Sequence, residues 1–244
     1  MYLFSINQST MTNRMLLFVF LMFNVNMVRS QLCTQYDCSY SKDVDCYFTL
    51  YKNGLYEIVL YKDYTEDLSS NTTLAYGKYV YQNGKITCYD QYSGFQMVYS
   101  YNPKYLQPEK AFFGLKNKKL LLDQYHTVMP NDKPDFLDYK GISESLRQIK
   151  SEFKKSQKIL NDFKPAIYDD SFGERILILQ PDHRYRMLIY NIIMSNGTWS
   201  LQGNELVLYD EDLKCKFYAF IKKDKLICGL FSINDRNILM VRRK

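Results

Sequence analysis

The chain has 244 residues, of which 46% are hydrophobic and 16% aromatic, and it carries a formal net charge of +6. This length and apolar content suit one or two packed domains and exclude a disordered chain. The charge is mild, and its lysines and arginines are scattered over different segments rather than along one stripe, so we predict no nucleic-acid partner.

Residues 1–30 are predicted to be a cleaved signal peptide. A short apolar run, Met15 to Phe23, follows Arg14. Val28-Arg29-Ser30 then places residues of small or modest size where a signal peptidase needs them. A retained membrane anchor is the alternative, but two asparagines interrupt the run before it reaches the ~20 apolar residues that a span requires. We therefore expect a secreted, periplasmic or cell-envelope protein with no membrane span after cleavage.

The remainder of the chain is a duplication. At an offset of 129, the residues that recur are Leu50, Asn53, Tyr56 and Tyr61, as Leu179, Asp182, Tyr185 and Tyr190. Gly77-Lys78-Tyr79 recurs as Gly197-Thr198-Trp199 at an offset of 120. The offset falls by nine residues, which we attribute to a longer polar turn, Lys62 to Thr73, in the first copy. Matching positions in a duplication do the same packing work.

Each copy has the pattern of β-strands. Apolar and aromatic residues fall on alternate positions, as in Tyr56-Ile58-Leu60, and Asn53-Gly54 and Asn83-Gly84 are dipeptides typical of two-residue hairpin turns. Such short turns join antiparallel neighbours. We predict a mainly β protein with about seven strands per copy, each copy a small barrel or sandwich, and the pattern leaves open whether they form two barrels or one continuous sheet.

The predicted organisation has an N-terminal Cys-containing segment (31–44), β repeat 1 (45–127), a linker (128–171) and β repeat 2 (172–244). Within the linker, apolar residues recur at helical spacing from Ile142 to Phe163, which predicts one amphipathic helix over 141–163. The helix is expected to pack against a sheet or cover a barrel edge. A dimerising coiled coil, which would give a homodimer, and a membrane-surface helix are the alternatives.

The order of these features resembles small lipocalin-like β-meander domains of exported Bacteroidota proteins. The resemblance is carried by Asn53-Gly54-Leu55-Tyr56 with Gly77-Lys78-Tyr79, and by Asp182-His183-Arg184-Tyr185 with Gly197-Thr198-Trp199. It covers most of 45–124 and 172–242. The resemblance implies a fold and an exported setting, and it implies no activity.

All six cysteines follow the predicted cleavage point, and an even count in an exported chain favours disulfides. They are Cys33, Cys38, Cys46, Cys88, Cys215 and Cys228. Cys215 with Cys228 is the first candidate pair, and Cys46 with Cys88 is the candidate in the first copy. The spacing lacks the paired cysteines of zinc sites, so we predict no metal site.

Two sets of residues are candidates for a structural or ligand-binding role. Gly77, Tyr79, Gly197 and Trp199 form a structural motif in which glycine allows a turn or bulge and the ring caps one end of the unit. A sugar-stacking role for Trp199 is the alternative. Around one hairpin, four tyrosines offer flat amphipathic rings for a ligand, unless they only stabilise the sheet: Tyr92, Tyr99, Tyr101 and Tyr105.

No catalytic or cofactor-binding motif is present, so we predict a non-enzyme without a cofactor. The function expected is that of an exported binding module that contacts a glycan, a protein or a small apolar ligand. A structural or assembly protein that docks through residues 141–163 is the first alternative, and an unrecognised hydrolase is the second.

Overall fold

The computed structural model describes residues 32–65, 68–91, 94–132, 163–170, 173–203, 205–222, 224–228 and 239–243. These residues form strands and turns, and no helix is found among them. The predicted signal peptide and residues 141–162 of the predicted helix lie outside the described residues. Phe163, the last residue of that helix prediction, is described and lies in non-helical backbone. The described part of the chain offers no helix suited to crossing a bilayer.

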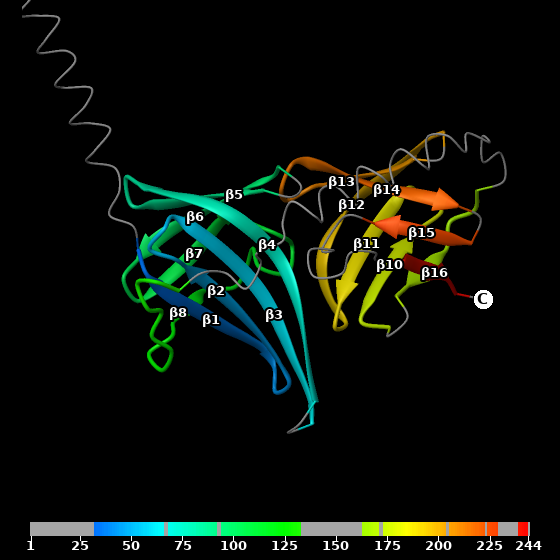
Figure 1. Ribbon diagram of the computed structural model, residues 1–244. Coiled ribbons are helices and arrows are strands. Elements are labelled where there is room, and N and C mark those ends of the chain that lie inside the picture. Colours follow the sequence, from blue (N-terminus) through cyan, green and yellow to red (C-terminus); the bar gives the residue numbers. More distant parts are fainter. Residues whose placement is uncertain are drawn as a thin grey trace, which may run out of the picture.

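Eight antiparallel strands close the first barrel, called barrel 1 here (Figure 1). Their bounds are β1 (Thr34–Ser41), β2 (Val44–Leu50), β3 (Leu55–Thr65), β4 (Leu68–Gln82), β5 (Lys85–Asp90), β6 (Gln96–Asn102), β7 (Tyr105–Lys110) and β8 (Leu120–Leu122). Each strand pairs with the next one along the chain. The last strand returns to the first through the pairs Tyr36–Leu122 and Asp37–Leu121, which closes the barrel.

A second closed barrel, barrel 2, follows with the same connectivity. Its strands are β9 (Ile167–Asp169), β10 (Arg175–Leu179), β11 (Arg184–Ile189), β12 (Ile192–Gln202), β13 (Glu205–Asp210), β14 (Cys215–Lys222), β15 (Lys225–Cys228) and β16 (Leu239–Arg242). Two tandem antiparallel units are thereby confirmed, and they are two barrels rather than one sheet. The prediction of seven strands per copy was one too low, because β1 and β9 fall in the segments 31–44 and 128–171, which were predicted to lie outside the repeats.

The two barrels share the same register as well as the same order. Tyr56 of β3 pairs with Gly77 of β4, which pairs with Asp90 of β5. The matching row in barrel 2 is Tyr185, Gly197 and Asp210. A Tyr–Gly–Asp row across three strands is therefore one part of the duplication that both barrels keep unchanged.

Glycine is required in the middle of that row. A Cβ atom at Gly77 would lie 2.0 Å from the carbonyl oxygen of Tyr89, and one at Gly197 would lie 1.9 Å from that of Tyr209. Real Cβ atoms do not approach backbone oxygens so closely, because atoms in protein interiors are already at van der Waals contact. The sequence motif Gly-x-aromatic thus reflects a close backbone approach at a paired strand position, where the sequence had predicted a turn or bulge.

The longer first copy is not a polar turn. Its additional residues extend the β3–β4 hairpin, so that β3 has 11 residues and β4 has 15, against 6 and 11 in β11 and β12. The extended hairpin reaches barrel 2, where the Tyr64 hydroxyl donates to Glu174 at 2.5 Å and the Ser70 hydroxyl donates to the same carboxylate at 3.1 Å. Figure 1 shows this long hairpin running beside the second barrel.

Further contacts join the two barrels, and we call this contact region the junction. The Tyr190 hydroxyl lies 3.0 Å from that of Ser70, and the buried Arg175 donates to Thr72 Oγ1 at 3.1 Å. Phe95, after β5, packs edge-on against Phe217 of β14 with ring centroids 5.8 Å apart. The barrels meet through the ends that carry the equivalent β5–β6 and β13–β14 turns. Consequently, the opposite end of each barrel lies away from its neighbour.

Candidate functional site

At the end of barrel 1 that lies away from the junction, four tyrosines occupy inward-facing strand positions. We call this group the tyrosine mouth, and its members are Tyr36, Tyr79, Tyr81 and Tyr101. Tyr36 lies near the start of β1, and the others lie near the ends of β4 and β6. Neighbouring strands of an antiparallel barrel run in opposite directions, so these strand ends meet at the same rim.

The rings of the tyrosine mouth contact one another. Tyr81 and Tyr101 are half-buried and pack edge to face, with centroids 4.9 Å apart. Tyr36 is fully buried below them, and its pKa is raised by burial and by the neighbouring Tyr101. Tyr79 donates its hydroxyl to the carbonyl of Leu32 at 2.7 Å and lies 3.3 Å from that of Tyr51. Tyr81 and Tyr101 are therefore the rings that solvent reaches.

Barrel 2 shows which part of this arrangement is structural. Trp199 occupies the position of Tyr79, and its indole N–H donates to the carbonyl of Gln180 at 3.0 Å. Gln180 is the repeat equivalent of Tyr51, so both rings bind the backbone at the same point. This common bond supports the predicted capping role of the Gly-x-aromatic motif. Phe163 and His183 also pack on Trp199, with centroids at 5.7 and 4.6 Å.

The exposed members of the mouth differ between the barrels. At the offset of 120, Tyr81 corresponds to Leu201 and Tyr101 to Ile221. The strand pairing supports this match, because Ile86 pairs with Tyr99 as Leu206 pairs with Ala219. The two half-buried phenols therefore belong to barrel 1 alone, although the scaffold that holds them is shared.

Of the four tyrosines predicted to bind a ligand, only Tyr101 lies in the mouth. Tyr99 is fully buried deeper in barrel 1, where its ring lies 5.1 Å from that of Phe48. Tyr105 lies on the outer face with Lys119 Nζ 3.6 Å from its ring centroid. Tyr92 lies outside the described residues. Strand alternation puts Tyr105 on the outer face, whereas Tyr99 shares the inward face of β6 with Tyr101 but lies two residues deeper. Tyr36 and Tyr81 were missed because they lie far from that hairpin in sequence.

The predicted disulfides are not formed. Cys33, Cys38, Cys46, Cys88 and Cys215 all have free thiols. The pairing of Cys215 with Cys228 was wrong in register, because Cys228 lies opposite Ala219. Four residues of strand separate position 219 from Cys215, about 13 Å. A disulfide needs Cα atoms within ~7 Å.

Cys46 and Cys88 do not bond either. Cys46 is on β2 and Cys88 is on β5, so two strands of the barrel wall lie between them. Both side chains are fully buried inside barrel 1.

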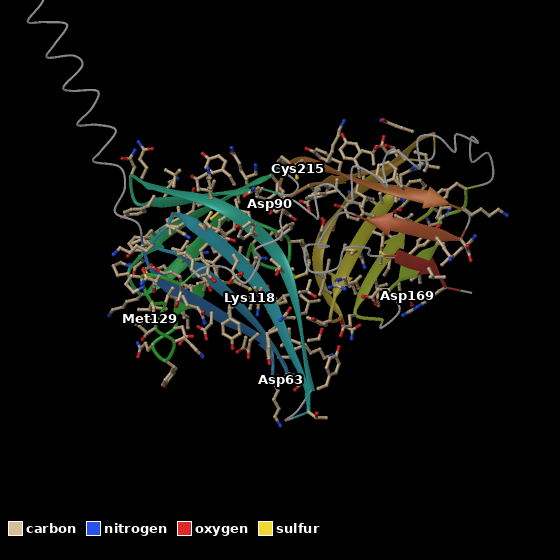
Figure 2. All side chains as sticks on the ribbon, viewed as in Figure 1. Asp63, Asp90, Lys118, Met129, Asp169 and Cys215 are labelled. Atoms are coloured by element: carbon tan, nitrogen blue, oxygen red, sulfur yellow. The ribbon has the colours of Figure 1, made fainter. Side chains whose placement is uncertain are left out.

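Two groups of ionisable residues are the catalytic candidates. His126 Nδ1 lies 2.5 Å from Asp123 Oδ2, and Asp123 also accepts the backbone N–H of Tyr125, so this contact closes the turn after β8. Figure 2 shows Asp90 beside Cys215 where the barrels meet, and burial raises the pKa of the Cys215 thiol to about 12. A thiol with so high a pKa is a poor nucleophile at neutral pH. Among the described residues, no group of His, Cys, Asp and Glu could hold a metal ion.

No protein-family model, curated protein or solved structure matches this chain. The tyrosine mouth is the candidate site because of its geometry and because of the difference between the two barrels.

Buried phenols give the mouth a pH dependence. Burial raises the pKa of Tyr36 above its ordinary value of 10.0. The stability contributed by the neutral phenol is therefore fully present below pH 10.0 and is lost as the pH rises towards the pKa of the folded state. We expect Tyr36→Phe to unfold at a higher pH than the wild type in an alkaline titration followed by circular dichroism. Identical alkaline midpoints would contradict this placement of Tyr36.

Proposed function

We propose that the protein is an exported, non-catalytic binding module and that the tyrosine mouth of barrel 1 contacts its ligand. The observation that carries the proposal is the difference between the barrels at one rim. Barrel 1 places the half-buried rings of Tyr81 and Tyr101 where barrel 2 has Leu201 and Ile221. Ligand sites of β-barrels commonly lie at their mouths.

The interior of barrel 1 supports a site at the rim rather than a deep one. Its largest side chains fill the space between the strands and are fully buried, namely Tyr36, Tyr56, Tyr99, Phe48 and Phe112. An eight-stranded barrel has an interior just wide enough for its own side chains or for one small ligand. Because side chains already occupy it here, the ligand would contact the rim.

The chemistry of the rim favours a carbohydrate end group over a wholly apolar ligand. A phenol offers an aromatic face for the C–H groups of a sugar and a hydroxyl that donates and accepts hydrogen bonds. Tyrosine also immobilises few torsions on binding, so little entropy is lost. A wholly apolar ligand would be served as well by the leucine and isoleucine of barrel 2.

The double variant Tyr81→Leu/Tyr101→Ile tests this proposal, because it gives barrel 1 the residues that barrel 2 already accommodates. We expect the wild-type mature chain to bind members of an oligosaccharide array. The double variant should bind them at least tenfold more weakly, a change of about 1.4 kcal/mol.

Tyr105→Leu is the matched control, because that ring lies on the outer face of the same barrel, and it should bind like the wild type. Equal binding by the wild type and the double variant would overturn the assignment of the site. Binding of no oligosaccharide by the wild type would overturn the ligand class.

A further inference from the structure

The first hairpin of barrel 1 places two cysteines opposite each other. Cys38 of β1 and Cys46 of β2 are direct cross-strand partners, and both side chains face the barrel interior. Cα atoms of such partners are ~4.5–5.5 Å apart in antiparallel sheets. Disulfides span Cα distances of about 4.4–6.8 Å, so this pair meets the requirement without movement of the backbone.

The two thiols differ in their surroundings. Cys46 is fully buried, whereas Cys38 is half-buried at the edge of the core. Lys118 donates to the carbonyl of Ser39 at 3.2 Å, which places a positive charge beside Cys38. Hydrogen bonding with the Cys46 thiol, and then the charge of Lys118, lower the pKa of Cys38, while the same contact and burial raise that of Cys46. A thiolate is the attacking form in thiol–disulfide exchange, so Cys38 is the group suited to react first.

The other described thiols lack such a partner across a strand. Cys88 lies opposite Tyr79 on one side and Met97 on the other. Cys215 lies opposite Asp210. Cys33 precedes β1, and its thiol contacts the carbonyl of Val128 at 3.2 Å. Register alone therefore selects Cys38 and Cys46.

We propose that Cys38 and Cys46 are a redox pair that forms a reversible cross-strand disulfide by exchange with a low-molecular-weight disulfide. The Cys38 thiolate attacks one sulfur of that disulfide, forms a mixed disulfide and releases one thiolate. Cys46 then loses its proton to the released thiolate and attacks the Cys38 sulfur, which expels the second thiolate. Two protein thiols are oxidised to one disulfide, and the small disulfide is reduced to two thiols.

The hairpin that would be bridged also supports the junction of the barrels. Tyr40, between the two cysteines in sequence, donates its hydroxyl to the carbonyl of Gly114 at 2.7 Å. The Gly114 N–H in turn lies 3.4 Å from the carbonyl of Met194 in barrel 2. Oxidation of the pair would therefore fix the strand that carries this contact, without a change of fold.

Peptide mapping tests the proposal directly. The full chain is reduced, equilibrated with glutathione and glutathione disulfide at several ratios, alkylated, and cleaved before aspartate. Cleavage at Asp37, Asp43, Asp45 and Asp63 puts Cys38 in the peptide 37–42 and Cys46 in the peptide 45–62, each with no other cysteine. We expect these peptides to be recovered as one linked species, lighter by two hydrogen atoms than their sum, in a fraction that rises with glutathione disulfide.

The variants Cys38→Ser and Cys88→Ser distinguish this pair from its neighbours. Cys38→Ser should abolish the linked species and leave Cys46 alkylated, because the initiating thiolate is absent. Cys88→Ser should leave the linked species unchanged. Alkylation of both cysteines at every glutathione ratio, or linkage of either one to Cys33 or Cys88, would overturn the proposal.

Discussion

Gly197→Ala is expected to lower the free energy of unfolding by roughly 3–5 kcal/mol, a large effect for one methyl group. The added Cβ would lie 1.9 Å from the Tyr209 carbonyl oxygen and 3.2 Å from Cε1 of Tyr185. Relief requires β12 and β13 to separate, because a backbone oxygen in a paired strand cannot turn aside. Gly77→Ala should behave in the same way in barrel 1, where the Cβ would lie 2.0 Å from the Tyr89 oxygen. Urea denaturation measures both losses.

Gly203→Ala provides the matched control for a glycine without a close neighbour. Gly203 has a φ of +69°, and a Cβ there meets nothing within 4 Å. Its alanine variant should therefore lose only the ~1–2 kcal/mol that a left-handed backbone conformation costs a side chain. If Gly197→Ala were no more harmful than Gly203→Ala, the close approach of strands in the Tyr–Gly–Asp row would be wrong.

Asp210→Ala is expected to cost roughly 3–5 kcal/mol, because three donors lose their acceptor. The carboxylate is fully buried and accepts the backbone N–H groups of Asp212 and Leu213 at 2.9 and 2.7 Å. It also accepts the Ser195 hydroxyl at 2.5 Å, and that hydroxyl lies 2.8 Å from the hydroxyl of Tyr185. Thermal unfolding should show the loss.

Two further variants provide a control, Glu211→Ala, and a test of how the stability depends on pH, Asp210→Asn. Glu211→Ala removes the neighbouring carboxylate, which pairs with Arg184 at the surface, and it should cost less than about 1 kcal/mol. Burial raises the pKa of Asp210 despite its hydrogen bonds. The stability contributed by its neutral form is therefore present below the ordinary value of 3.8 and is lost as the pH rises through the folded pKa. Asp210→Asn should remove that pH dependence, and equal losses from the Asp210 and Glu211 alanine variants would contradict the role of the buried carboxylate.

The secondary structure could largely be predicted because its causes are local. Alternation marks strands, and the turn Asn83-Gly84 adopts positive φ at both residues, 53° and 73°, as a two-residue hairpin turn requires. The duplication then extended each local inference to a second copy. Barrel closure was not predictable in this way, because β9 has only three residues and displays no alternation that could be recognised.

Features that depend on register or on contact between the copies could not be predicted. The pairing of Cys215 with Cys228 required knowledge of which residue faces which, and the sequence supplied only the order of strands. Residues 62–73 were interpreted as a polar turn because their side chains are polar. In the structure, Ser70 and Thr72 are polar because they bond to barrel 2 across the junction.

The candidate site was predicted only in its residue type. Tyrosines were expected to contact a ligand, but their proximity in sequence was a poor guide, since Tyr99 and Tyr105 point to opposite faces of the barrel wall. A better signal was present in the duplication itself. Tyr81 and Tyr101 differ from Leu201 and Ile221, although the residues around them match between the two repeats. Such a difference marks a position whose residue is not dictated by packing alone.

Native mass spectrometry of the protein purified from the cells that produce it tests the central claim most directly. We predict extra mass of carbohydrate size on the wild type that is lost on denaturation and is absent from Tyr81→Leu/Tyr101→Ile. A bare monomer, or the same extra mass on both proteins, would contradict the binding role of the tyrosine mouth. A multiple of the monomer mass without extra mass would instead favour assembly through residues 141–163.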